Sequence, residues 1–130
     1  MIRTAICIAS ILISVTAMAQ KSQIARKELL KASMNQKVTV AEVQEITMEG
    51  GQTAPRHLHP CPVIGIIKSG EAVFQIEGEK SIVLHEGDAF YEPKNVNILH
   101  FDNASKEKPL VFTATYLKEG HEENIRFLNK

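Results

Sequence analysis

Residues 51–70 read GQTAPRHLHPCPVIGIIKSG, and this stretch decides the fold and the first hypothesis about function. His57 and His59 stand two residues apart, between turn signals at Gly51 and at Ser69-Gly70. On an extended strand, side chains two residues apart project from the same face, so both imidazoles can reach one metal ion. The stretch therefore predicts a strand that carries a metal site.

Short apolar or alternating runs surround this stretch and are separated by glycine- and proline-bearing turns. Residues 63–67 are continuously apolar, which is typical of a strand buried on both faces. Residues 71–77 alternate and form a hairpin with residues 81–85. Further strands are predicted for residues 38–48, as one long strand or a bent pair, and for residues 89–92, 96–101 and 110–117. At least seven short strands and no convincing long helix indicate an all-β sandwich or small barrel.

The first 19 residues are predicted to be a cleavable signal peptide. Arg3 supplies a basic start, residues 5–15 are almost continuously apolar, and Ala17-Met18-Ala19 offers a small-x-small cleavage site. The apolar run is too short to span a bilayer comfortably, so an uncleaved anchor is the weaker alternative. We expect a periplasmic or secreted chain that begins at Gln20, without stable membrane insertion after cleavage.

The mature chain carries a nearly balanced charge. Arg3 is removed from the 15 basic residues, which leaves 14 against 15 acidic residues and a net charge of −1. This balance favours neither a nucleic-acid partner nor an anionic membrane. Cys61 is the single cysteine left after cleavage, so an intramolecular disulfide is excluded. Residues 20–36 are expected to form an N-terminal segment, residues 37–118 one β domain, and residues 119–130 a C-terminal tail.

The order of these signals resembles the cupin family, a jelly-roll barrel that holds a metal or small ligand in its mouth. The family's first motif is a glycine, five residues, His-x-His, three or four residues, a glutamate, six residues and a glycine. Gly51, His57, His59 and Gly70 match it, whereas Val63 stands at the glutamate position. The resemblance implies a cupin-like jelly roll for residues 37–118.

The second motif of the family matches only in part. It runs glycine, five residues, Pro-x-Gly, two residues, histidine, three residues, asparagine. Gly87 and Pro93 match, but Asn95 replaces the glycine and Ile98 the histidine. His100 lies two residues further along, and a shift of two keeps a side chain on the same strand face. We therefore predict that His100 replaces the missing ligand.

His57, His59 and His100 are thus the predicted metal ligands. Neutral imidazole nitrogens bind Fe, Mn, Ni, Zn or Cu, and three of them leave open coordination positions. Without a carboxylate, such a site keeps more positive charge and suits an anionic ligand. For each of these histidines, a solvent-facing polar role is the alternative.

Tyr91, Glu92 and Cys61 are the candidates for proton transfer near the barrel mouth. Tyr91 and Glu92 point to opposite strand faces, and either can reach the mouth. Cys61 lies between two prolines and is a candidate nucleophile or ligand, or else a small buried residue. The core and pocket walls are expected to comprise Ile64, Ile66, Phe74, Ile76, Phe90, Ile98, Phe112 and Ala114.

Two functions from different classes follow. The first is a metal-dependent cupin enzyme, of dioxygenase or isomerase type, that acts on a small molecule. The second is a non-catalytic module that binds a small ligand without a required metal, and a metal-free structural dimer is a third possibility. The resemblance also implies a homodimer, with residues 20–39 as a candidate pairing strand.

Overall fold

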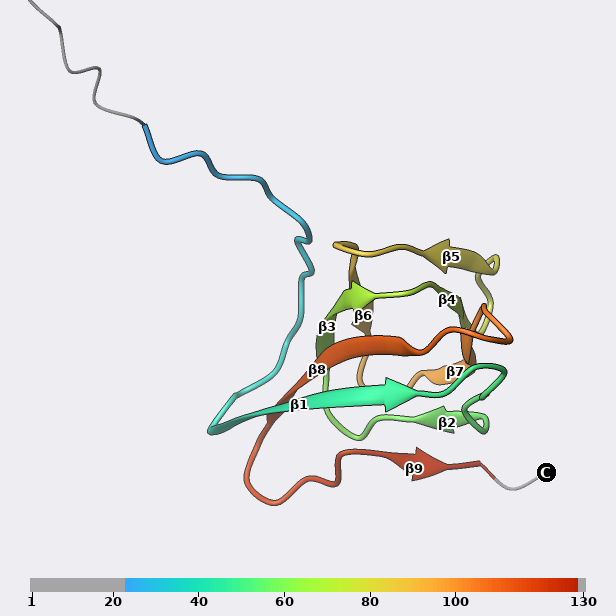
Figure 1. The fold of residues 1–130 in the computed structure, drawn as a ribbon. Coiled ribbons are helices and arrows are strands. Elements are labelled where there is room, and N and C mark those ends of the chain that lie inside the picture. The colour runs from blue at the N-terminus through green and yellow to red at the C-terminus, as the bar shows by residue number, and fades with distance from the viewer. Residues whose placement is uncertain (1–22, 129–130) are drawn as a thin grey trace, which may run out of the picture.

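The computed structural model describes residues 23–128, which form nine strands and no helix (Figure 1). The predicted signal peptide and its cleavage site lie outside the described residues. Within residues 23–128 no helix is long and apolar enough to cross a membrane. The strands are β1 (Val40–Met48), β2 (His57–Leu58), β3 (Val63–Ser69), β4 (Ala72–Ile76), β5 (Ile82–Leu84), β6 (Ala89–Glu92), β7 (Asn97–Asn103), β8 (Leu110–Lys118) and β9 (Arg126–Phe127).

The strands make two antiparallel sheets. One has the order β1-β8-β3-β6 and the other the order β5-β4-β7-β2-β9. Strands that neighbour each other in a sheet are mostly distant in sequence, as in a jelly roll. The two sheets enclose a common interior, and β2 and β9 lie at the lower edge in Figure 1. The predicted all-β jelly roll is confirmed.

Alternating burial along the strands builds the core from both sheets. In β8, four residues on one face are buried, namely Leu110, Phe112, Ala114 and Tyr116. Phe112 meets Phe90 of β6 and Phe101 of β7, and both of these contact Phe74 of β4, in an aromatic cluster with neighbouring ring centroids 4.6 to 6.0 Å apart. Such tilted and edge-to-face pairs stabilise the fold beyond the burial of their area. This cluster fills part of the interior and leaves the rest for a cavity.

The prediction that residues 63–67 are buried on both faces is wrong. Val63, Gly65 and Ile67 are buried, but Ile64 is half-buried and Ile66 is 39% exposed. β3 lies inside an antiparallel sheet whose outer face is not covered by another layer of the described chain, so only alternate residues reach the core. Ile64 and Ile66 therefore do not belong to the core.

Gly65 lets the Phe90 ring of β6 and the backbone of β8 lie close against the centre of β3, within one sheet. A Cβ atom at this position would lie 2.1 Å from the ring of Phe90 and 2.2 Å from the carbonyl oxygen of Thr113. Since real Cβ atoms do not approach that closely, any larger residue would displace the Phe90 ring from the aromatic cluster.

Candidate metal centre

Three buried side chains converge where β2 and β6 end. His57 is the first residue of β2, His59 directly follows that strand, and Glu92 is the last residue of β6. Their exposed fractions are 4%, 4% and 3%. One potential ligand atom from each lies within 4.8 Å of the other two. The sheets thus place two imidazoles and one carboxylate around a single point.

Backbone carbonyls fix the orientation of both imidazoles. His57 Nδ1 donates to the carbonyl oxygen of Pro55 at 2.7 Å, and His59 Nδ1 donates to that of Asn124 at 2.5 Å. A carbonyl can only accept, so each Nδ1 carries a proton and Nε2 is the nitrogen left for a metal. Metal-binding histidines usually donate their other ring N–H to a carbonyl or carboxylate in this way.

Glu92 holds a polar atom that the protein itself does not satisfy. Its Oε2 lies 3.0 Å from His59 Nε2, whereas its Oε1 is buried without a hydrogen-bond partner. A buried carboxylate oxygen is costly unless a donor or cation compensates it. Among the described residues it is the single buried side-chain atom of this kind. The donor set therefore fits a divalent cation.

The two imidazoles differ in their affinity for protons. Burial lowers the pKa of His57, and the Pro55 carbonyl and the charge of Glu92 offset this only in part. Burial also acts to lower the pKa of His59, but the hydrogen bond to Glu92 and the charge of that carboxylate outweigh it, so the pKa is raised. The lowered pKa favours the neutral form of His57, whereas the raised pKa favours the protonated form of His59 when no metal is bound.

Strand register explains how Glu92 reaches the two histidines. Val63, which stands at the glutamate position of the first motif, pairs directly with Glu92 across β3 and β6. Directly paired residues project from the same face of a sheet. The carboxylate that the first motif lacks is therefore present on the neighbouring strand. Sequence reasoning placed Glu92 near the mouth but missed it as a candidate ligand.

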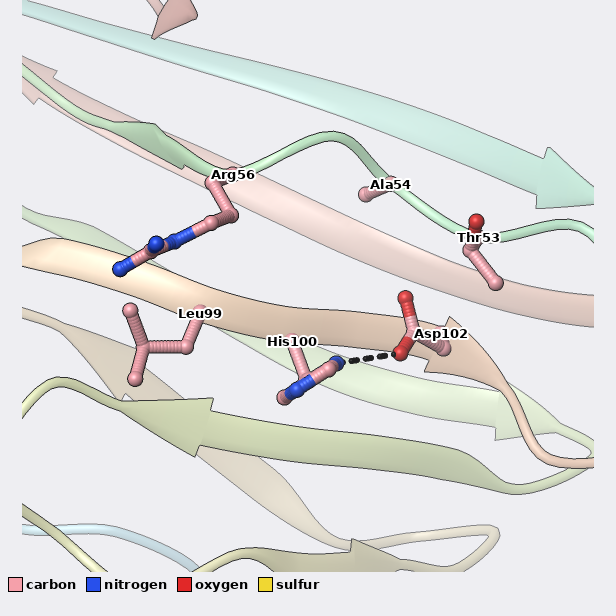
Figure 2. Close-up of a pocket in the computed structure, with 6 residues that line it drawn as sticks. All are labelled: Thr53, Ala54, Arg56, Leu99, His100 and Asp102. Atoms are coloured by element: carbon pink, nitrogen blue, oxygen red, sulfur yellow. Dashed lines mark hydrogen bonds and ion pairs between the residues drawn. The ribbon is translucent and has the colours of Figure 1, made fainter. Parts of the chain in front are cut away.

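His100 does not join this group. β7 pairs with β4 through Ile98 opposite Ile76 and His100 opposite Gln75, so the register shifts by one residue at Leu99. This bulge breaks the alternation on which the prediction rested. Ile98 is fully buried, whereas the His100 side chain is 52% exposed. Figure 2 shows His100 beside a surface pocket, where its Nδ1 lies 2.8 Å from Asp102 Oδ2.

The other two candidates for proton transfer lie apart from the convergent groups. Tyr91 pairs with Ile64, and both face the half-exposed outer side of the four-stranded sheet. Cys61 is fully buried, and its Sγ donates to the carbonyl oxygen of Glu123 at 3.8 Å. Burial raises the pKa of the Cys61 thiol, which disfavours the reactive thiolate.

A cavity of about 260 Å³ opens beside the convergent side chains. His57, His59 and Glu92 form part of its wall, and most other wall residues are apolar, such as Ile46, Met48, Ala54, Phe101, Phe112 and Phe127. Tyr116 also lines it, and its ring centroid lies 5.8 Å from that of His59. Burial, followed by the charge of Glu92, raises the pKa of Tyr116 to about 12. Its phenol thus stays protonated and can donate a hydrogen bond.

Tyr116 was missed by the sequence reasoning, although its signal is present. It follows Phe112 and Ala114, both predicted to face the interior, in the same period of two along β8. The alternation therefore places its ring inside the barrel. The ring comes close to the histidines because β8 lies next to β3, where Tyr116 pairs with Val63, four residues after His59.

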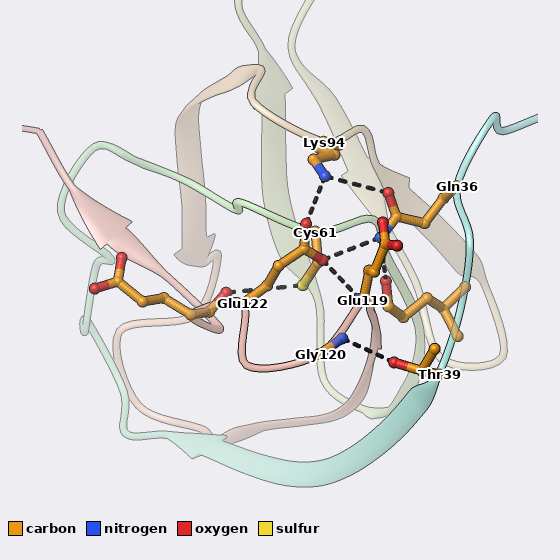
Figure 3. Close-up of polar contacts among 9 residues, drawn as sticks. Gln36, Thr39, Cys61, Lys94, Glu119, Gly120 and Glu122 are labelled. Atoms are coloured by element: carbon orange, nitrogen blue, oxygen red, sulfur yellow. Dashed lines mark hydrogen bonds and ion pairs between the residues drawn. The ribbon is translucent and has the colours of Figure 1, made fainter.

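The C-terminal residues 119–128 cover one side of the site, and we call them the C-terminal strap. β9 within the strap pairs with β2, and Ile125 and Phe127 contribute to the cavity wall. Figure 3 shows how the strap is held: Glu122 contacts Lys94 and Gln36, and Gly120 N donates to Thr39 Oγ1 at 2.8 Å. The predicted tail is therefore a packed part of the site.

Lys118 and Glu42 anchor the middle of the strap. Lys118 Nζ contacts Asn124 Oδ1 at 3.0 Å, and Asn124 Nδ2 contacts Glu42 Oε1 at 2.9 Å. Lys118 Nζ also pairs with Glu42 Oε2 at 2.7 Å. Because the carbonyl of Asn124 holds His59, these contacts connect strap docking to the metal centre.

Comparison with known proteins identifies the family. The Cupin domain family matches residues 44–116, so the chain belongs to the cupin family. None of the curated proteins matches the chain significantly. The matched region contains His57, His59 and Glu92, and it ends at Tyr116.

Solved structures share the fold. A cupin-like protein from Thermotoga maritima is 26% identical, with a TM-score of 0.58 over 68% of this chain and 64% of that one. An oxalate oxidase in complex with glycolate is 23% identical, with a TM-score of 0.58 over 68% and 46%. A DMSP lyase from Ruegeria pomeroyi is 24% identical, with a TM-score of 0.58 over 67% and 42%. The chain spans less than two thirds of the length of each of these proteins.

Proposed function

We propose that this cupin binds one divalent transition-metal ion through His57 Nε2, His59 Nε2 and the Glu92 carboxylate, and that it acts on a small molecule held in the cavity. The observation that carries the proposal is the buried Glu92 Oε1, which has no partner and stands beside two imidazoles whose tautomers are already fixed. Iron, manganese, nickel, zinc and copper all suit this donor set.

Two imidazoles and one carboxylate are the ligand set of many non-haem iron oxygenases, and zinc or manganese enzymes use similar sets. A metal ion held there supplies Lewis-acid or redox chemistry to a coordinated oxygen atom. The chain's own groups orient the substrate: Tyr116 donates a hydrogen bond from the wall, and the apolar side chains exclude bulk water. We therefore favour a metal-dependent enzyme of dioxygenase or isomerase type.

A non-catalytic binding module is the second candidate. The mostly apolar wall of the cavity offers burial to a small ligand with or without a metal. The close contact of His59 with Glu92 also gives these residues a stable metal-free arrangement, an ion pair. Ligand binding that is indifferent to a chelator would favour this module over the enzyme.

The decisive experiment measures metal content. Untagged mature protein is analysed beside a His57→Ala, His59→Ala double variant and a His100→Ala control. We expect close to one metal ion per chain in the wild type and in the control, and none in the double variant. Activity on small oxygen-bearing substrates should then disappear on chelation and return with one particular ion. Absence of metal from all three proteins would refute the proposal.

We further propose that the mature chain is exported and forms a homodimer. The signal-like residues 1–19 support export, and detection of a mature N-terminus at Gln20 in a periplasmic or secreted fraction would test it. Exposed apolar residues on the four-stranded sheet, among them Val43 at 65% and Ile66 at 39%, support pairing. Sedimentation that shows a monomer at high concentration would contradict the dimer.

A further inference from the structure

We infer that the cavity selects a small oxygen-donor ligand that has a largely apolar body and at most one negative charge, such as an enolate or a phenolate. This inference rests on the proposed metal site and concerns what the site accepts. It draws on the charge, the size and the polar groups of the cavity wall.

The charge of the wall sets the first limit. A divalent ion and the Glu92 carboxylate together carry one positive charge, because both histidines bind as neutral ligands. No lysine or arginine lines the cavity among the described residues. A monoanion would therefore neutralise the site, whereas a dianion would leave an unpaired negative charge among apolar side chains. Burial of an unpaired charge is strongly unfavourable.

Three cationic side chains of the surrounding segments pair with carboxylates elsewhere. The Lys118 ammonium pairs with Glu42, and Arg126 pairs with Glu123 on the outer side of the strap. Arg56 pairs with Glu77, and its side chain is 61% exposed beside the surface pocket of Figure 2. None of them is a wall residue of the cavity. The wall also contains the uncharged polar residues Thr47, Gln52 and Thr53, but a phosphate or a second carboxylate on the ligand would find no cationic side chain there.

Size and polarity set the second limit. A volume of about 260 Å³ lies below the ~300–1,000 Å³ typical of sites for drug-sized ligands. Aromatic and aliphatic residues from both sheets and from the strap, including Phe101, Phe112 and Ile125, suit a planar or branched hydrocarbon body. Tyr116 places one hydrogen-bond donor on the same wall as the metal ligands. A ligand with one or two oxygen atoms at one end satisfies this pattern.

Two chelators of similar reach test the inference. Tropolone is a monoanion with a carbocyclic body, and oxalate is a dianion without one. Zinc-loaded wild-type protein is titrated with each by calorimetry, and zinc retention is checked after gel filtration. Relative to their affinities for the aqueous ion, we expect tropolone to bind at least about tenfold better than oxalate, as the unpaired charge of oxalate requires.

Variants sharpen the result. Tyr116→Phe should weaken tropolone binding about tenfold because one hydrogen bond to a charged oxygen is lost. The control Tyr91→Phe alters the outer face of the same sheet and should change nothing. Ile125→Lys places a cation in the wall at a residue that is 36% exposed and should shift the preference toward oxalate.

The failure modes are distinct. If wild-type protein retains zinc but prefers oxalate, or if Tyr116→Phe and Tyr91→Phe behave alike, the ligand class is wrong while the metal site stands. If wild-type protein retains no zinc at all, the proposed function fails, and the ligand class fails with it.

Discussion

Residues 23–128 contain three close pairs of histidine and carboxylate, and two of them, His59 with Glu92 and His100 with Asp102, differ sharply in burial. His59 and Glu92 lie 3.0 Å apart with side chains 5% exposed, whereas His100 and Asp102 lie 2.8 Å apart with exposed fractions of 52% and 16%. The buried pair leaves one carboxylate oxygen without a partner. Water can satisfy the surface pair, so it has no comparable need for a cation. Burial therefore distinguishes the two pairs as candidate metal sites.

The largest expected effect comes from removing one carboxylate charge from each pair. Glu92→Gln keeps the size of the side chain but loses the anionic ligand. Metal affinity should fall at least about 100-fold, which is more than the loss of a group that only orients a ligand costs. Asp102→Asn is the matched change at the surface pair and should leave the affinity unchanged. Competition with a fluorescent zinc indicator measures both. Equal affinities in the two variants would place the metal elsewhere.

The strap provides the next test, because it covers the buried pair and not the surface pair. Removal of residues 119–130 takes away the Asn124 carbonyl that orients His59. Metal affinity should fall roughly tenfold to 100-fold, as it does when other groups that orient a metal-binding histidine are lost. Removal of residues 129–130 alone serves as the control. Circular dichroism must show that the barrel persists. An unchanged affinity in the long truncation would show that the strap does not position His59.

A smaller effect is expected from moving the carboxylate back across the sheet. Val63 pairs directly with Glu92, so Val63→Glu combined with Glu92→Val exchanges the two side chains on one face. We expect the double variant to bind metal about tenfold better than Glu92→Val alone, though less well than the wild type, because the supporting residues are not adapted. Dialysis against zinc compares the three proteins. If the double variant binds metal no better than Glu92→Val, a carboxylate on the same sheet face is not sufficient, and its position on β6 is required.

Much of the fold was predictable because alternation and turn residues act locally. Residues 89–92 were predicted as a strand with the observed bounds, and residues 110–117 differ from β8 by a single residue. His57 and His59 were also predictable, because their relative placement depends only on one short extended segment. The local pattern thus positions two of the three convergent side chains.

The rest of the site depends on contacts between distant segments. Glu92 becomes a candidate ligand through its register with Val63, and no pattern within residues 89–92 encodes that pairing. His100 was misplaced because a bulge at Leu99 shifts the strand parity by one, and this bulge arises from pairing with β4. In sequence the strap resembles a charged tail, because the β9 pairing and the side-chain contacts that dock it are made with segments distant in the chain. Register and docking are tertiary properties.

The smallest expected effect is a pH dependence of the strap. Hydrogen bonds from Lys118, Asn124 and Gln44 lower the pKa of Glu42 from 4.5 to about 2, and the contact with Lys94 lowers that of Glu122. Asn124 and Glu122 belong to the strap, so the part of this lowering that depends on their contacts requires a docked strap. That part of the stabilisation is fully present above pH 4.5 and is lost as the pH falls from 4.5 through the lowered pKa values. Hydrogen-exchange protection of residues 119–128, corrected for intrinsic rates, should therefore fall over this range.

The same hydrogen-exchange experiment compares the strap, which covers His59 and Glu92, with β7, which carries His100 and Asp102. Over the same pH range, protection of the central β7 amides should change less than that of the strap, because backbone pairing with β4 holds that strand. A Glu42→Gln variant should already show the weakened strap at neutral pH. If strap and β7 lose protection together, acid unfolds the whole barrel, and the strap is not an independently docked cover.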